Sequence, residues 1–476
     1  MAVQVQKPVL VGGLGLCLLL LGWESVHTHL LEMGQWGLWG MTAFGLLFWK
    51  LKRSTKSSLA VLTPLTRQTV DTAIAQAQTI IDTLATEAPE QDVTHFRQQL
   101  TELPSHFDRQ ILNIGITGTK GTGKSALKNL LAAKVTTHNV NWQESEPLLI
   151  VDNHERSLQN LAKFDLTLFL ISGDLTDSEW QTLQNLYRNH HRLLLLFNKQ
   201  DQYRPEERVE ILQKIQHQIS PILPESEIFG LSVAPKPLKV RRHLEDGTIE
   251  EFFEETKVDL APLTQHLTSV INQEKADLIL GTTWREAQQI KQTAKEQLNQ
   301  IRRDRALPVI EQYQWIAGGT ALINPVASLD LLATAAINGQ MVLDLSGIYQ
   351  QKFSLEQAQS VAAEVGQLIV KLGLVELSTQ SLGSLLKTNA VTYVAGGAIQ
   401  GVSAAYLTRV AGLSLVEYFQ AQEISQQTGE GLNLEKLGQT LQQVFAQTQR
   451  LSLLQDFAKK AIAALPNSKK MENSIA

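Results

Sequence analysis

Residues 118–125 read Gly-Thr-Lys-Gly-Thr-Gly-Lys-Ser, a complete G-x-x-x-x-G-K-S string, and this string constrains the fold more than any other part of the chain. It follows a strand-like apolar run at 111–116 and precedes a helix-like run at 125–131. In that context the glycines let successive backbone N–H groups turn toward a phosphate, Lys124 supplies a cation, and the Ser125 hydroxyl can ligate Mg²⁺. The string therefore predicts an α/β fold with a site for a nucleoside triphosphate.

A second string, Asn198-Lys199-Gln200-Asp201, indicates which base is bound. It directly follows the apolar run 193–197, which is typical of a buried parallel strand, and ligands bind beyond the carboxyl ends of such strands. The Asp201 carboxylate can accept hydrogen bonds from N1–H and the 2-amino group of guanine, whereas adenine would leave it unpaired. We expect guanine specificity, with Asn198 bridging the phosphate loop and the base and the Lys199 stem lying on the purine.

With both strings in place, residues 109–235 resemble the Era/TrmE-like GTPases, which implies a doubly wound, mostly parallel sheet that binds GTP and Mg²⁺. By this resemblance Asp152, after the run 148–151, takes the place of the aspartate that holds a Mg²⁺-bound water, and Thr136 or Thr137 is the switch threonine. Lys124 and Asp152 are then the catalytic candidates, and Ser125, Asp152 and Thr136 the metal candidates. The expected nucleotide-binding residues are Gly118, Lys120, Gly121, Thr122, Gly123, Lys124, Ser125, Ala126, Asn198, Lys199, Asp201, Ser232 and Val233.

The chain departs from that family where hydrolysis is controlled. The family has D-x-x-G where residues 152–155 read Asp-Asn-His-Glu, so Glu155 stands in place of a glycine whose N–H meets the γ-phosphate. Residue 156, where some relatives place a water-orienting Gln, is Arg. Lys120 is either an additional cation for the γ-phosphate or a solvated side chain. We therefore expect nucleotide binding with slow hydrolysis.

Two uncharged apolar stretches, residues 9–23 and 36–49, open the chain. Lys7 precedes the first, and Lys50, Lys52 and Arg53 follow the second, whereas the segment between them has no Lys or Arg. The positive-inside rule then predicts a transmembrane hairpin with both termini cytoplasmic, which places the protein in the inner membrane as a multi-pass protein. A cleaved signal peptide, a lipoprotein site at Cys17 and a buried soluble hairpin are the alternatives, and the flanking residues favour the anchor.

The cysteine content and the net charge limit which compartment and which partners we expect. A single cysteine in 476 residues excludes a disulfide framework and fits a reducing compartment. The net charge of −5 gives no indication of nucleic-acid binding.

The rest of the chain divides by pattern into several further regions. Apolar residues at threes and fours from Val70 to Leu84 predict a helical stalk, and a hairpin of strands at 238–243 and 248–253 follows the guanine loop. A long helix near 260–306 is expected to end before Pro308. The predicted domains are an anchor at 1–53, a stalk at 54–108, a GTPase domain at 109–260, a connecting helix at 261–306, a helical domain at 307–425 and an amphipathic tail at 426–476.

The composition changes after Pro308 to stretches rich in Ala, Gly and Val. Strings such as Ala317-Gly318-Gly319 and Ala395-Gly396-Gly397 allow helices to approach closely, either in a membrane or in a tight bundle. With the segment 325–330, residues 305–425 resemble the YcjF-type domain of unknown function. We expect an all-α domain that is soluble or peripheral, with residues 434–464 forming one further helix.

Together these features predict a membrane-anchored GTP-binding switch with an unidentified protein partner, a possible homodimer through the GTPase domain, and no nucleic-acid partner. Two alternatives remain: a structural membrane protein whose nucleotide is never hydrolysed, and a dynamin-like membrane remodeller.

Overall fold

The computed structural model describes residues 62–135, 139–147, 160–243, 249–254, 258–323, 327–388, 397–421, 433–449 and 451–464. The predicted anchor at 1–53, Thr136, Thr137 and the segment 152–156 lie outside these ranges.

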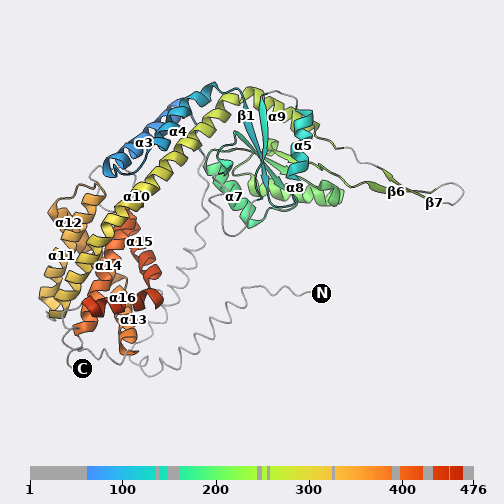
Figure 1. The fold of residues 1–476 in the computed structure, drawn as a ribbon. Helices are drawn as coiled ribbons and strands as arrows, with labels where there is room; N and C mark the ends of the chain where they lie inside the picture. Colours follow the sequence, from blue (N-terminus) through green and yellow to red (C-terminus); the bar gives the residue numbers. More distant parts are fainter. Residues whose placement is uncertain are drawn as a thin grey trace. The chain divides into compact units, whose positions relative to one another are not determined.

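Residues 112–230 contain the strands of a five-stranded parallel sheet (Figure 1). Its strands are β1 (Leu112–Gly118), β2 (Val140–Glu144), β3 (Leu166–Ile171), β4 (Arg192–Phe197) and β5 (Ile228–Gly230), in the order β2-β1-β3-β4-β5. All six residues of β3 are buried, as expected for a strand covered on both faces. The predicted α/β class with a parallel sheet is confirmed, and we refer to this unit as the G domain.

The α-helices of the described residues that accompany the sheet are α5 (Lys124–Lys134), α7 (Asp177–Arg188), α8 (Pro205–Ile219) and α9 (Ala261–Gln273). A capping box of Thr176 and Glu179 begins α7, with each side chain bonded to the other residue's backbone N–H. Apolar residues of α5 and α9 share one core with β1 and β3, so the helix that follows the phosphate string is packed against the last helix of the G domain's core.

Strands β6 (Leu238–His243) and β7 (Ile249–Glu254) confirm the predicted hairpin, within one residue of its expected bounds. They pair antiparallel with each other and form a separate two-stranded sheet, so the hairpin does not extend the parallel one.

The predicted stalk is helical. It consists of α3 (Arg67–Glu87), α4 (Thr94–Glu102) and the 3₁₀ helix η1 (Leu103–Asp108). The periodic residues from Val70 to Leu84 are buried, and their core is completed by Ala287, Ala294 and Leu298 of the long helix α10.

Helix α10 runs from Lys275 to Ile323 with Pro308 inside it, so the prediction that the helix ends before Pro308 is wrong. Its predicted beginning near residue 260 is wrong as well, because residues 261–273 form the separate helix α9. Proline removes one backbone hydrogen bond and crowds the preceding turn. Here the residues on both sides of it, Ala306 and Ile310, are fully buried in a helical core. Tertiary packing on either side of the proline therefore outweighs its local cost.

The remaining helices are α11 (Ala327–Ile348), α12 (Leu355–Lys371), α13 (Leu374–Thr388), α14 (Gly397–Ala421), α15 (Leu434–Thr448) and α16 (Leu451–Ala464). The single helix predicted at 434–464 is in fact two helices, α15 and α16. A Cβ on Gly412 of α14 would lie 2.8 Å from Ile310 of α10, so small residues do bring these helices close together. Among the described helices, none is both long and apolar enough to cross a bilayer.

Candidate functional site

The loop between β1 and α5 has the backbone that its glycines allow. Gly118, Gly121 and Gly123 have φ values of 146°, 83° and 101°, a region that L side chains rarely adopt. A Cβ on Gly118 would also lie 2.4 Å from the Leu170 carbonyl oxygen. The expected strand–loop–helix context of the string is therefore present, with the loop at the carboxyl end of β1.

Lys124 lies inside this loop and is 5 % exposed. Its Nζ donates hydrogen bonds of 3.0 Å to the carbonyl oxygens of Gly118 and Thr119. Burial lowers the pKa of Lys124, and the Glu144 carboxylate acts in the opposite direction. An ammonium held in this way by carbonyl oxygens is positioned to meet an anion.

Ser125 contacts a carboxylate that the sequence analysis missed. Its Oγ donates a 3.1 Å hydrogen bond to Oε1 of Glu144, the last residue of β2. Strand β2 pairs parallel with β1, and Glu144 lies opposite Ile116, so both strands end at the same edge of the sheet. Asp152, the predicted metal ligand, lies outside the described residues.

A hydroxyl and a carboxylate are oxygen ligands that suit Mg²⁺, so Ser125 and Glu144 fit a magnesium site. In the described part of the chain, no group of three or more His, Cys, Asp or Glu side chains is placed to hold a metal.

The side chains at the other positions of the phosphate loop differ in their surroundings. Lys120 is exposed to solvent, and both alternatives for this residue stay open. The Thr122 hydroxyl donates to the carbonyl oxygen of Thr119 at 2.9 Å, and the Thr119 hydroxyl donates to Glu179 of α7 at 3.2 Å. These bonds fix the shape of the loop and tie it to α7.

Asn198 joins the phosphate loop to the loop after β5. It is fully buried, its Nδ2 donates to the Thr122 carbonyl oxygen at 2.7 Å, and its Oδ1 accepts from the Val233 amide at 3.0 Å. The bridging role predicted for Asn198 toward the phosphate loop thus has a described geometry. Because the Val233 amide is engaged in this way, it supports the loop and is not free to bind a ligand.

Asp201 lies on the same edge of the sheet, after β4. Its amide donates to the Ser232 hydroxyl at 3.0 Å, and its Oδ2 accepts from the Lys236 amide at 3.3 Å. Lys199, two residues earlier, has a positive φ of 64°. The structure therefore brings the phosphate loop, Glu144, the loop of Asn198 and Asp201, and the loop of Ser232 together at the carboxyl ends of the strands.

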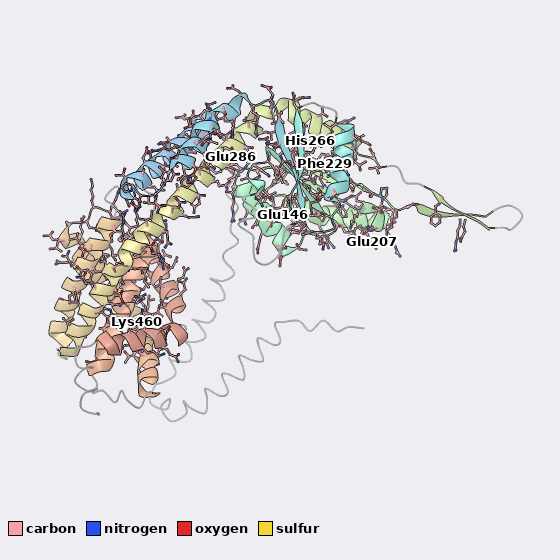
Figure 2. The ribbon with its side chains drawn as sticks, in the orientation of Figure 1. Glu146, Glu207, Phe229, His266, Glu286 and Lys460 are labelled. Atoms are coloured by element: carbon pink, nitrogen blue, oxygen red, sulfur yellow. The ribbon has the colours of Figure 1, made fainter. Side chains whose placement is uncertain are left out.

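A second ionic cluster fixes α9 and the beginning of α10 to the sheet. Arg192 at the start of β4 donates to Glu274 at 2.7 Å and to Glu227 at 2.9 Å. Glu227 is also 3.0 Å from Nε2 of His266, whose ring lies beside that of Phe229 (Figure 2). This cluster is structural, because it lies away from the carboxyl ends of the strands and joins parts of one core.

Comparisons with known proteins support parts of this description. A domain of unknown function, DUF697, matches residues 285–450, which agrees with the predicted YcjF-type region and extends it on both sides. Among curated proteins, none matches the chain.

Two solved structures illustrate the range of structural likeness. The translation elongation factor SelB from Methanococcus maripaludis is 16% identical over 34% of this chain and 33% of that protein, with a TM-score of 0.25. The chain thus spans about a third of the length of that factor. A bacterial dynamin pair described as sensing and tethering membranes is 14% identical over 85% of this chain and 84% of that one, with a TM-score of 0.26. Likenesses this distant leave the function to be argued from the site.

Proposed function

We propose that this chain is a GTP-binding protein with slow GTPase activity, in which the nucleotide state acts as a switch for the C-terminal helical domain. The observation that carries the proposal is the bridge made by Asn198, which ties the Lys124 loop to the loop of Val233 on the edge of the sheet where Asp201 also lies. A ligand with phosphates at one end and a base at the other could then contact all three loops.

Guanine is the base that the Asp201 carboxylate fits. A carboxylate accepts two hydrogen bonds from N1–H and the 2-amino group, and a site built for those bonds discriminates strongly against a base that lacks them. Ser232 and Lys236 already position Asp201 through its amide and one carboxylate oxygen. With the Val233 amide engaged by Asn198, we expect a neighbouring amide of the same loop to meet the guanine oxygen.

The metal ligands in this proposal are Ser125 and Glu144. When bound, Mg²⁺ would neutralise charge that develops on the transferring phosphoryl group. Lys124 would move from the Gly118 and Thr119 carbonyls toward the β- and γ-phosphates. Asp152 and Thr136 remain further candidates for the metal site.

Slow turnover follows from the residues after Glu144. If Glu144 takes the place of the first residue of the D-x-x-G pattern, the fourth is Pro147, which has no N–H to offer the γ-phosphate. If Asp152 takes that place instead, the fourth is Glu155. Neither reading supplies the glycine donor, so a partner, dimerisation or a cation is needed for fast hydrolysis. The same feature favours a second candidate, a nucleotide-bound protein that does not hydrolyse GTP.

Residues 1–53 would anchor the switch in the inner membrane with both termini cytoplasmic. The basic residues that follow the second apolar stretch motivate this part of the proposal. A dynamin-like remodelling activity would in addition need self-assembly of the G domain.

The test is nucleotide binding by the full-length protein in detergent or nanodiscs, with fluorescent GTP, GDP and ATP in Mg²⁺. We expect GTP and GDP to bind and ATP to bind at least about a hundredfold more weakly, because adenine leaves the Asp201 carboxylate without the two hydrogen bonds that guanine donates. Lys124→Ala should abolish binding, whereas Lys134→Ala, which changes an exposed lysine in the last turn of α5, is the matched control and should retain it. Equal affinities for ATP and GTP, or unchanged GTP affinity in a folded Lys124→Ala protein, would refute the proposal.

A further inference from the structure

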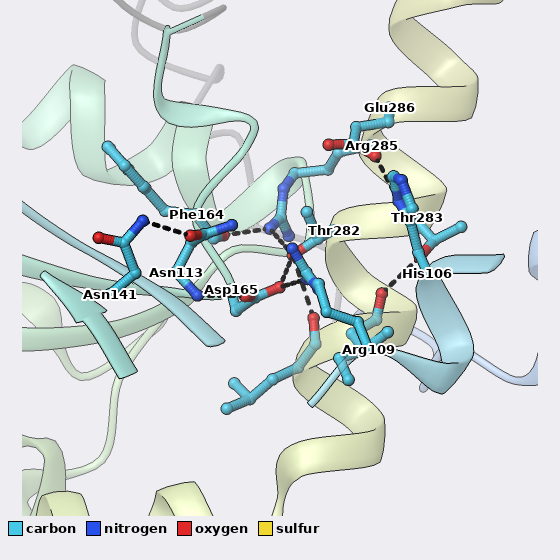
Figure 3. Close-up of polar contacts among 12 residues, drawn as sticks. His106, Arg109, Asn113, Asn141, Phe164, Asp165, Thr282, Thr283, Arg285 and Glu286 are labelled. Atoms are coloured by element: carbon cyan, nitrogen blue, oxygen red, sulfur yellow. Dashed lines mark hydrogen bonds and ion pairs between the residues drawn. The ribbon is translucent and has the colours of Figure 1, made fainter. Parts of the chain in front are cut away.

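A buried polar cluster joins the first turns of α10 to the G domain (Figure 3). At its centre, the fully buried carboxylate of Asp165 accepts hydrogen bonds from Arg109 at 2.5 Å, from the Asn113 amide at 2.6 Å and from the Thr282 hydroxyl at 2.6 Å. Arg109 and Asn113 lie before and within β1, Asp165 precedes β3, and Thr282 belongs to α10. One carboxylate thus connects two strands of the sheet to the long helix.

Arg285, one turn further along α10, holds the G domain through its backbone. Its guanidinium donates to the carbonyl oxygens of Phe164 at 2.6 Å, His190 at 2.8 Å and Ala162 at 3.1 Å. Arg285 is 4 % exposed. A planar fork of donors in a nearly dry site needs all of its acceptors in place, because a buried cation with missing partners is costly.

Two of the carbonyl groups that Arg285 holds, those of Ala162 and Phe164, directly precede β3, and the third, that of His190, precedes β4. Glu144 ends β2, the described strand that comes before β3 in the chain. Phe164 also packs over Gly115 of β1 so closely that a Cβ there would lie 2.0 Å from its ring. Any change in the backbone that directly precedes β3 therefore alters acceptors that Arg285 needs.

Helix α10 connects this cluster to the rest of the protein. Its residues Leu278 and Ile279 belong to the core of the G domain, Ala287 to Leu298 to that of the stalk, and Ala306 and Ile310 to that of the helical domain. The DUF697 match begins at Arg285 itself. A residue that binds the G domain thus lies within the part of the chain that matches the domain of unknown function.

We propose that Arg285 is a positioning residue through which the nucleotide state of the G domain is coupled to the helical domain. The inference rests on the proposed function, since it needs a nucleotide that rearranges the chain after Glu144, as γ-phosphate does in nucleotide switches. The hydrogen bonds of α10 to residues 162–165 would differ between the GTP-bound and the GDP-bound protein, and this difference lets α10 respond to the nucleotide. Because linkage is reciprocal, α10 must in turn change the relative affinity for GTP and GDP.

The experiment measures hydrogen exchange on the full-length protein with Mg²⁺ and either GDP or a non-hydrolysable GTP analogue. In the wild type, the two nucleotides should give different exchange in peptides from 160–171 and also in peptides from 275–298. In Arg285→Lys, which keeps the charge but loses the fork, the difference should persist at 160–171 and disappear at 275–298. The ratio of the Kd values for GDP and the analogue should change by about fivefold or more.

Arg302→Lys is the matched control. Arg302 is another buried arginine of α10, 4 % exposed, whose Nε and Nη2 donate to Glu87 of the stalk at 3.0 and 2.6 Å. Its substitution removes a comparable fork without touching the G domain, so the Kd ratio and the exchange difference at 275–298 should stay within twofold of the wild type. If Arg285→Lys does not fold, Thr282→Val, which keeps the shape and removes the hydroxyl bonded to Asp165, decides by the same two measurements.

Wild-type protein that binds both nucleotides with identical exchange at 275–298 would overturn the inference and leave the proposed function intact. An equal change of the Kd ratio in Arg285→Lys and Arg302→Lys would overturn it as well, because the effect would then be one of stability. Absence of any guanine-nucleotide binding would overturn the proposed function and this inference with it.

Discussion

Replacing Asn198 by alanine should damage both the stability of the G domain and its affinity for nucleotide. The side chain is fully buried and makes hydrogen bonds to the Thr122 carbonyl at 2.7 Å and from the Val233 amide at 3.0 Å. Truncation leaves both backbone groups unpaired, at about 1–3 kcal/mol each. Water that enters the cavity left by the side chain recovers part of this cost. We therefore expect the free energy of unfolding of the G domain to fall by about 2–4 kcal/mol.

The consequence for binding can be worked from the same bonds. Without Asn198 the phosphate loop and the loop of Val233 are no longer tied together, so binding must supply the energy that orders them. A cost of about 2 kcal/mol corresponds to a roughly thirtyfold rise in the Kd for GDP. Loss of affinity should therefore accompany loss of stability in this variant.

Hydrogen exchange of peptides that cover β1 and β4, together with titration of fluorescent GDP, measures both effects. Asn141→Ala is the control, because Asn141 is exposed on neighbouring β2 and its Nδ2 makes a 3.0 Å bond to the Asn113 side chain. That variant should lose less than about 1 kcal/mol and keep its affinity. A loss in Asn198→Ala no larger than in the control would show that the two loops are held by other contacts and that our reasoning is wrong.

Four further outcomes are expected. Asp201→Asn should change the preferred nucleotide from GTP to xanthosine triphosphate, because an amide donates a hydrogen bond where the carboxylate accepted one. Competition titrations in which the variant still prefers GTP would contradict this. Glu144→Gln should raise the Mg²⁺ concentration needed for binding of a GTP analogue more than Asp152→Asn does. A larger increase in Asp152→Asn would show that Asp152 is the metal ligand instead. Burial, with the charge of Arg285 as the second cause, holds the pKa of His191 well below its ordinary 6.5, so the unfolded chain binds a proton that the folded one does not. Stability present above pH 6.5 should then be lost as the pH falls, by up to about 1.4 kcal/mol per pH unit, and His191→Gln should flatten that slope in thermal unfolding. Single-turnover GTP hydrolysis by the isolated protein should run at about 10⁻⁴–10⁻² s⁻¹, and a rate above about 1 s⁻¹ would contradict the assignment of a missing glycine donor.

The phosphate loop was predictable because its chemistry is local, whereas the Asn198 bridge, whose partners lie 76 and 35 residues away, was predictable only from the N-K-x-D string. Glycines at φ values of 83° and 101° and a lysine beside them leave few alternatives for a short loop between a strand and a helix. The apolar runs of β3 and β4 were likewise visible, because both faces of those strands are buried.

Glu144 was missed for the complementary reason. It ends β2, the edge strand of the sheet, whose residues are half-buried or exposed and whose sequence Val-Asn-Trp-Gln-Glu is mostly polar. A continuous apolar run is the usual signal of a buried strand, and the run at 148–151 is more apolar than β2. The metal-site carboxylate was therefore assigned to Asp152, which follows that run. Only the pairing of β2 with β1 places the Glu144 carboxylate beside Ser125.

The arginines of α10 show a further limit of sequence reasoning, since charges on a long helix are ordinarily solvated. Arg285 and Arg302 are instead nearly buried, one bonded to carbonyl oxygens of the G domain and the other to Glu87 of the stalk. Gln350, which follows α11, also donates to Glu87 at 2.6 Å.

These charges fix where each part of the protein packs along α10. Apolar contacts are not directional, but close ones such as that of Gly412 with Ile310 already oppose a shift of this 49-residue helix. A shift by one turn would also leave a buried guanidinium without its partners at each of two positions, and removing the partner of a buried charge costs about 3–5 kcal/mol. The guanidinium groups of Arg285 and Arg302 therefore add a directional constraint on the register of α10 to that of the apolar contacts.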